Sequence, residues 1–218
     1  MNAKSIFPVL LLVLLIAGSA VYWVEAPMAP SVQALQLKAG TLLSQPRTLP
    51  DVILKASDGS DKFSHDYAGK WTLLFAGYTH CPDVCPTTMS DLNRVSQLLL
   101  QQGIDPQKFR ILFLSIDPER DTAEKLRDFA RYFNPAFEAV TAKPSDLEVF
   151  TKALGVVYLK IPADKASPAD KYVMDHSTAV LLLDPAFRFA GLFSAPHDPQ
   201  AIADDLVKIL AVYPDVKG

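Results

Sequence analysis

Two cysteines, Cys81 and Cys85, are the residues whose type and spacing most clearly suggest chemistry. They are the only cysteines among 218 residues, and the second follows the first by four positions. An apolar run over 71–75 precedes them and a helical pattern from Met89 follows, which predicts a strand, a tight turn and a helix with both sulfurs at its N-terminus. A helix N-terminus favours ionised thiols. The pair can therefore bind a soft metal ion when reduced, or form a disulfide when oxidised.

A purely structural disulfide is the alternative for this pair. Closing so short a loop stabilises a fold by only about 2 kcal/mol on the chain-entropy estimate. Half of the residues are hydrophobic and 21% are charged, which predicts a large core that gains little from such a bond. The net charge of −3 and the pI near 5.8 predict no nucleic-acid binding. Redox or metal chemistry is therefore favoured.

The N-terminal segment predicts a membrane anchor. Residues 6–24 form an uncharged apolar run of 19 residues, which is long enough to cross a bilayer as a helix. Lys4 precedes the run, so the amino end is expected to stay in the cytoplasm. A signal peptide cleaved after the small residues 18–20 is the alternative. We expect a single-pass protein of a bacterial inner membrane, with its soluble domain in the periplasm.

Three regions follow from this pattern. Residues 1–24 are the predicted anchor, 25–47 a proline-containing tether, and 48–218 a soluble domain. Strand and helix patterns alternate within the domain. The predicted strands are 52–56, 62–64, 71–75, 110–116, 137–141, 156–161, 178–183 and 187–193. Four helices are predicted: one starts at Met89, one is capped by Asp121, and two cover 145–154 and 199–212.

This order predicts an α/β domain with a thioredoxin-like fold. Two elaborations accompany it: an extra N-terminal β-hairpin, and an insertion over 146–175, with a polar loop at 162–170, before the C-terminal hairpin. In such a fold the loop entering that hairpin, 172–177, lies beside the cysteine turn, so His176 should face the two sulfurs. Two thiolates and one imidazole suit Cu(I) and tolerate Cu(II), whereas a structural zinc site would need a fourth ligand.

Other side chains near this predicted site have less specific signals. His80 should point away, because side chains alternate along extended chain. His65 lies in a polar loop, and His197 in a turn that could lie near the mouth of the site. Met174 is either a soft ligand or a packed side chain. Arg120 either pairs with a carboxylate or faces a partner protein.

Three separated segments resemble the Sco/SenC family of copper chaperones. They are 75–86, 117–122 and 175–177, within a match that covers roughly Leu49 to Pro214. Ala123 stands where many members of that family carry a proline. Because a proline there would only begin a helix, this difference leaves the metal site unaffected.

The resemblance implies a membrane-tethered thioredoxin-like domain that binds one copper ion, Cu(I) or Cu(II), through Cys81, Cys85 and His176. It further implies a role in assembling the dinuclear copper centre of cytochrome c oxidase subunit II. A periplasmic copper carrier or a thiol reductase is a further expected partner. The prediction is a metallochaperone rather than an enzyme.

The same two cysteines support an alternative function. A thiol–disulfide oxidoreductase would use Cys81 and Cys85 as a redox-active pair to reduce the target's cysteines without donating copper. The CxxxC spacing weakens this alternative, since the usual redox motif is CxxC. A peroxiredoxin is a third possibility, but the Pro-x-x-x-Thr-x-x-Cys motif of that family is missing from the sequence.

Overall fold

The structure is a computed structural model that describes residues 35–162 and 172–213. The predicted anchor at 1–24, the first part of the predicted tether and most of the predicted polar loop lie outside these ranges. Among the helices inside them, none is both long and apolar enough to cross a membrane.

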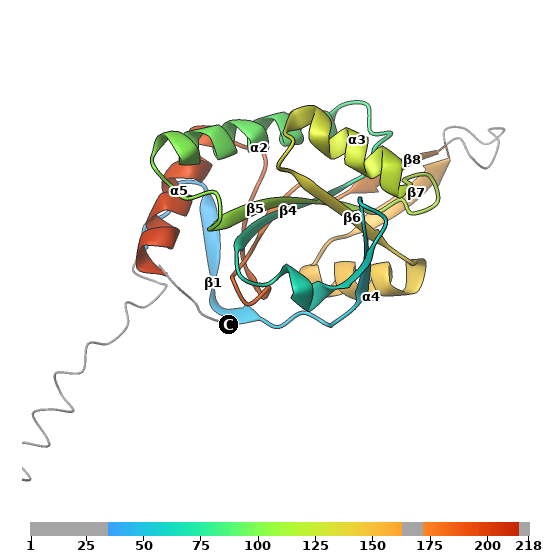
Figure 1. The fold of residues 1–218 in the computed structure, drawn as a ribbon, viewed down its shortest axis with the longest axis horizontal. Helices are drawn as coiled ribbons and strands as arrows, with labels where there is room; N and C mark the ends of the chain where they lie inside the picture. The colour runs from blue at the N-terminus through green and yellow to red at the C-terminus, as the bar shows by residue number, and fades with distance from the viewer. Residues whose placement is uncertain (1–34, 163–171, 214–218) are drawn as a thin grey trace, which may run out of the picture. The chain divides into compact units, whose positions relative to one another are not determined.

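An eight-stranded mixed sheet forms the centre of the domain (Figure 1). Its strand order is β1 (Gly40–Arg47), β10 (Phe189–Phe193), β9 (Val180–Leu183), β4 (Trp71–Gly77), β5 (Phe109–Ser115), β6 (Glu138–Ala142), β2 (Ile53–Ala56) and β3 (Asp61–Phe63). β4 runs parallel to β5 and antiparallel to β9, and all seven of its residues are buried. A central strand covered on both faces explains its uninterrupted apolar sequence. The predicted N-terminal hairpin is confirmed as β2 and β3.

Helices cover both faces of this sheet. α2 (Val84–Gln101) packs against α5 (Pro199–Val212), and α3 (Ala123–Phe133) contacts β6 on the same side. α4 (Pro144–Leu154) lies across the sheet from α2 and α3 (Figure 1). It ends, as predicted, at Gly155, which adopts the left-handed conformation with φ 74°. The alternation of β4, α2, β5, α3 and β6, then a hairpin and α5, confirms the thioredoxin-like prediction.

The predicted tether is wrong over its last eight residues, which form strand β1. β1 pairs antiparallel with β10, with Gly40 opposite Phe193. The buried carboxylate of Asp205 on α5 fixes the approach to this strand by accepting hydrogen bonds from the amides of Lys38, Ala39 and Gly40 at 2.7–3.0 Å. The domain therefore begins before residue 48.

The second part of the predicted insertion contributes to a separate, two-stranded sheet. β7 (Tyr158–Pro162) pairs antiparallel with β8 (Tyr172–His176), and Tyr158 lies opposite His176. The prediction of a loop over 172–177 is therefore wrong for its first five residues, because β7 supplies a hydrogen-bonding partner. Tyr172 and Met174 are buried, whereas Val173 and Asp175 are exposed. One face of β8 thus packs on the domain, and His176 belongs to that face by strand alternation.

Candidate metal centre

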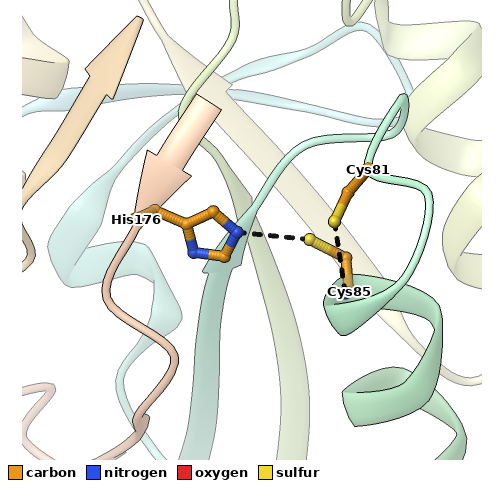
Figure 2. Close-up of side chains that lie close together, drawn as sticks. All are labelled: Cys81, Cys85 and His176. Atoms are coloured by element: carbon orange, nitrogen blue, oxygen red, sulfur yellow. Dashed lines mark hydrogen bonds between the residues drawn. The ribbon is translucent and has the colours of Figure 1, made fainter. Parts of the chain in front are cut away.

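The two cysteines lie where β4 leads into α2. Cys85 is buried in the first turn of α2, whereas Cys81 is half-buried in the preceding loop. Both sulfurs therefore lie at the helix N-terminus, as predicted, although the helix begins at Val84 and only Cys85 is inside it. The Cys85 amide donates a hydrogen bond to Cys81 Sγ at 3.4 Å, so the helix terminus still contacts both residues (Figure 2). Both are free thiols in this structure.

Gly77 at the end of β4 makes room for the buried sulfur. A Cβ atom at this position would lie 2.7 Å from Cys85 Sγ and 3.0 Å from Cε2 of Phe113. Real Cβ atoms essentially never show a contact as short as the one to the sulfur, and the one to Phe113 is also unusually tight. Glycine here is a requirement of close packing, which local sequence patterns do not reveal although the residue lies four positions before Cys81.

His176 is the third member of the site, as predicted. Its Nε2 atom lies 3.5 Å from Cys85 Sγ and points at the sulfur pair (Figure 2). Its Nδ1 atom lies 2.9 Å from the carbonyl oxygen of Ser177. A carbonyl oxygen only accepts hydrogen bonds, so this contact places a proton on Nδ1 and makes Nε2, which faces the sulfurs, the nitrogen that would bind a metal once it carries no proton. The local hydrogen bond thus selects the tautomer that can bind a metal.

Two aromatic rings surround the imidazole. The ring centroid of Phe75 on β4 lies 6.1 Å from the imidazole centroid. The Tyr78 ring centroid lies 6.0 Å from it, and the planes of these two rings meet at 88°. Both residues are buried. The imidazole therefore has apolar neighbours on the side of the main sheet, and its polar atoms face the sulfurs and Ser177.

The three donor atoms fit a single soft metal ion. They lie within 4.8 Å of one another, and this is the metal-binding cluster found in the described parts of the chain. Thiolate sulfur is the ligand type that Cu(I) prefers, and imidazole suits copper in either oxidation state. The donor set is therefore chemically suited to copper, with Cys81, Cys85 and His176 as its holders.

The cysteines differ in acidity because they interact with each other. A hydrogen bond from Cys85 holds the pKa of the Cys81 thiol well below its usual value of 9.0, although burial acts in the opposite direction. The interaction with Cys81 and burial together raise the pKa of Cys85. Burial lowers the pKa of His176, but hydrogen bonds with Cys81 and the Ser177 carbonyl outweigh burial and raise it. In the metal-free site Cys81 is thus the thiolate.

Asp121 anchors the cysteine loop instead of capping a helix. Its buried carboxylate accepts hydrogen bonds from the amide and hydroxyl of Thr79, at 3.0 and 2.6 Å, and from the Ser115 hydroxyl at 2.6 Å. Thr122 is the N-cap of α3 and accepts from the Lys125 amide. The predicted cap is therefore one residue out, because Asp121 is already occupied by the loop and by the end of β5.

The remaining histidines lie outside the three-residue cluster. His65 is exposed and contacts Asp51 at 2.9 Å. His80 turns toward Thr79 and Asp121, which agrees with the prediction that it points away from the sulfurs. His197 contacts the carbonyl oxygen of Thr178 at 3.0 Å.

Two further candidates have structural partners. Met174 is a buried side chain of β8, which supports the packing alternative. Arg120 pairs with the buried carboxylate of Asp117, one of its two predicted roles.

The sequence is similar to those of several known proteins. A family model described as SCO1/SenC matches residues 45–211. A bovine protein, "Protein SCO2 homolog, mitochondrial", is 32% identical over 152 residues, which make up 69% of this chain and 55% of that protein. The chain spans about half the length of the curated relatives it matches.

Two solved structures with copper bound have a similar fold. Arabidopsis thaliana ScoI superposes with a TM-score of 0.68 and 28% identity, over 75% of this chain and 98% of that one. Bradyrhizobium japonicum ScoI gives a TM-score of 0.63 and 30% identity, over 73% of this chain and 97% of that one. The matched region therefore includes nearly the whole of each solved chain.

Proposed function

Because the chain belongs to the SCO1/SenC family, we propose that it is a copper metallochaperone, which binds one copper ion through Cys81, Cys85 and His176. The proposed target is the dinuclear copper centre of cytochrome c oxidase subunit II, a role that follows from the resemblance to the Sco/SenC family. The observation that carries the proposal is the convergence of two sulfurs and one imidazole nitrogen within 4.8 Å of one another. Two similar structures that hold copper support the choice of metal.

The three ligands would have different parts in metal transfer. Cys85 is buried and would be the last ligand to release the ion, whereas the half-buried Cys81 is open to the thiol of an acceptor protein. The low pKa of Cys81 makes it a ligand near neutral pH without the loss of a further proton. Oxidation to a disulfide would remove both sulfur ligands, so copper loading and oxidation would exclude each other.

We place the domain in the periplasm, held to a bacterial inner membrane by residues 1–24. The support is the uncharged run of 19 residues that follows Lys4. Fractionation of cells that express the full chain, with protease treatment of spheroplasts, would test this location. A protease-resistant domain would contradict it.

Copper content of the reduced full chain tests the proposed function. Wild type should retain about one copper per chain against a competing chelator, and Cys81→Ser, Cys85→Ser and His176→Ala should each lose most of it. Removing a direct ligand should lower copper affinity by more than the roughly 10–100-fold that is typical when a residue hydrogen-bonded to a ligand is lost. His65→Ala is the matched control, since His65 is exposed, pairs with Asp51 and lies outside the three-residue cluster. Unchanged copper content in His176→Ala would overturn the proposal.

A dithiol reductase is the second candidate, favoured by the contrast between an accessible ionised thiol and a buried protonated one. The Cys81 thiolate would attack a target disulfide, and Cys85 would then resolve the mixed disulfide. Two electrons and the Cys85 proton pass to the target, whose two sulfurs leave as one thiol and one thiolate, and Cys81–Cys85 becomes the disulfide. Reduction of an oxidised subunit II peptide by the His176→Ala protein at the wild-type rate would favour this function over copper donation.

A further inference from the structure

The histidine ligand lies on a strand that the main sheet does not hold. In the described part of the chain β8 shares a hydrogen-bond ladder with β7, and these two strands form a sheet separate from the eight-stranded one. β4, which precedes the cysteines, is bonded on both sides by β5 and β9. Contacts other than a main-sheet ladder, side-chain contacts among them, therefore set the direction of His176 relative to the sulfurs.

A cluster at the start of β8 supplies such contacts. Tyr172, the first residue of the strand, donates its hydroxyl to Asp117 Oδ1 at 2.6 Å. Arg120 forms an ion pair with the same buried carboxylate, and its Nη1 donates to the carbonyl oxygen of Tyr172 at 2.9 Å. The guanidinium also lies over the Tyr172 ring, 3.6 Å from its centroid. One arginine thus binds both the backbone and the ring of the same residue.

Arg120 also reaches the other end of β8 through Tyr78. Its guanidinium carbon is 5.6 Å from the Tyr78 ring centroid. Tyr78 in turn packs against the His176 imidazole, with the ring planes at 88°. The guanidinium therefore contacts the ring that borders the ligand and the residue that begins the ligand's strand.

We propose that Arg120 is a positioning residue for the metal site, which aims His176 Nε2 at Cys81 and Cys85 by holding Tyr172 and Tyr78 together. This inference rests on the copper site proposed above. Arginine suits the task because its planar fork can stack on rings while donating at its edge, which lysine cannot reproduce. The carboxylate of Asp117 holds the guanidinium of Arg120 in place. Because this carboxylate is buried, water does not compete for the ion pair.

Copper competition measurements on the full chain test the role of Arg120. Arg120→Lys should weaken copper binding about 10–100-fold, as expected when a group that orients a ligand is lost. The matched control is Arg188→Lys, because Arg188 also pairs with a buried carboxylate, that of Asp184. Asp184 follows β9, at the end of the sheet away from the cysteines, since Leu183 pairs with Thr72 at the start of β4. Copper binding by the control should match wild type.

A double-mutant cycle separates positioning from general loss of structure. In the His176→Ala background, Arg120→Lys should have no further effect on copper affinity, because the side chain it orients is gone. An equal loss in both backgrounds would overturn the proposal. Should Arg120→Lys fail to fold, Tyr172→Leu gives the same test, since it removes the stacked ring and hydroxyl but leaves the Asp117–Arg120 pair.

A metal-free measurement distinguishes failure of this inference from failure of the proposed function. Long-range nitrogen–proton NMR spectra report the tautomer and environment of the His176 ring without copper. Arg120→Lys should move the ring resonances and weaken the contacts between His176 and Tyr78, whereas Arg188→Lys should not. Unchanged spectra in Arg120→Lys would overturn the positioning role. Wild type that binds no copper, with His176 resonances still shifted by Arg120→Lys, would overturn the copper function alone.

Discussion

The two halves of the candidate metal centre are held in different ways. The cysteine half follows a fully buried strand that is hydrogen-bonded on both sides, and Asp121 ties its loop to the end of β5. The histidine half lies on a two-stranded sheet that is joined to the domain through side chains such as Tyr172 and Arg120. Substitutions in the first half should therefore change fold stability and site together, whereas those in the second should change the site more than the stability.

Cys85→Ala should give the largest change on the cysteine side. The hydrogen bond from Cys85 is the main reason for the low pKa of Cys81, so its removal should return that pKa toward the usual 9.0. A titration followed by the ultraviolet absorbance of the thiolate would show the shift. His176→Ala should raise the same pKa by less, since the histidine contribution is the smaller one. An equal or larger effect of His176→Ala would reverse the assigned roles of the two halves.

Gly77→Ala should damage both stability and metal binding. The added methyl group would meet Cys85 Sγ at 2.7 Å and the Phe113 ring at 3.0 Å, and overpacking of this kind costs about 1–3 kcal/mol. Urea unfolding would measure the loss of unfolding free energy, and chelator competition the loss of copper affinity. The double variant Gly77→Ala/Cys85→Ala should recover part of the stability, because the sulfur is gone. Equal stabilities of Gly77→Ala and wild type would contradict the packing.

Asp205→Asn tests the main sheet far from the metal centre. Three amides lower the pKa of this buried carboxylate below 3.8, although burial acts in the opposite direction. A lowered folded-state pKa stabilises the fold above the unfolded pKa, and the contribution is lost as pH falls through the folded value. At pH 7 the variant should unfold about 1–2 kcal/mol more easily, and the difference should shrink below about pH 4.

Asp204→Asn is the control for that change. Its carboxylate pairs with the exposed Lys38 amine, so the variant should lose much less stability than Asp205→Asn does. Copper binding should stay at the wild-type level in both variants. A difference between Asp205→Asn and wild type that persists unchanged at low pH would contradict the ionised state of Asp205.

Glu119→Gln should have the smallest effect, and it tests which contacts position the β7–β8 sheet. Glu119 pairs with Lys160 of β7 at 2.7 Å, but both side chains are exposed. Exposed pairs contribute about 0–1 kcal/mol. Neither thermal stability nor copper affinity should change measurably. A loss of copper affinity as large as that of Arg120→Lys would show that the ion pair contributes as much as the arginine cluster to positioning the β7–β8 sheet.

Much of the fold and the site could be predicted from local sequence patterns. β4 was predictable because a strand buried on both faces is an uninterrupted apolar run. His176 was predictable from the order of elements, which brings the segment before the C-terminal hairpin beside the cysteine turn. These predictions succeeded because each rests on one strong pattern or on topology alone.

The errors arose where distant residues decide the local structure. β1 is a partly exposed edge strand without clear alternation, and the carboxylate that fixes its approach comes from Asp205, more than 160 positions later. Asp121 and Thr122 are adjacent residues that can both cap a helix. Only the hydrogen bonds from Thr79 and Ser115 determine that Asp121 serves the loop and Thr122 the cap.

The separation of the two sheets also affects how the site moves. Hydrogen bonds between β7 and β8 can break while the eight-stranded sheet stays intact. The reason is that no strand pairing joins the two sheets in the described residues. Local openings of this kind require less free energy than global unfolding. An opening that also released the Tyr172 contacts would carry His176 away from the sulfurs while the core stays folded. Such an opening would turn a three-donor site into a two-donor site, and it predicts faster amide hydrogen exchange in β8 than in β4.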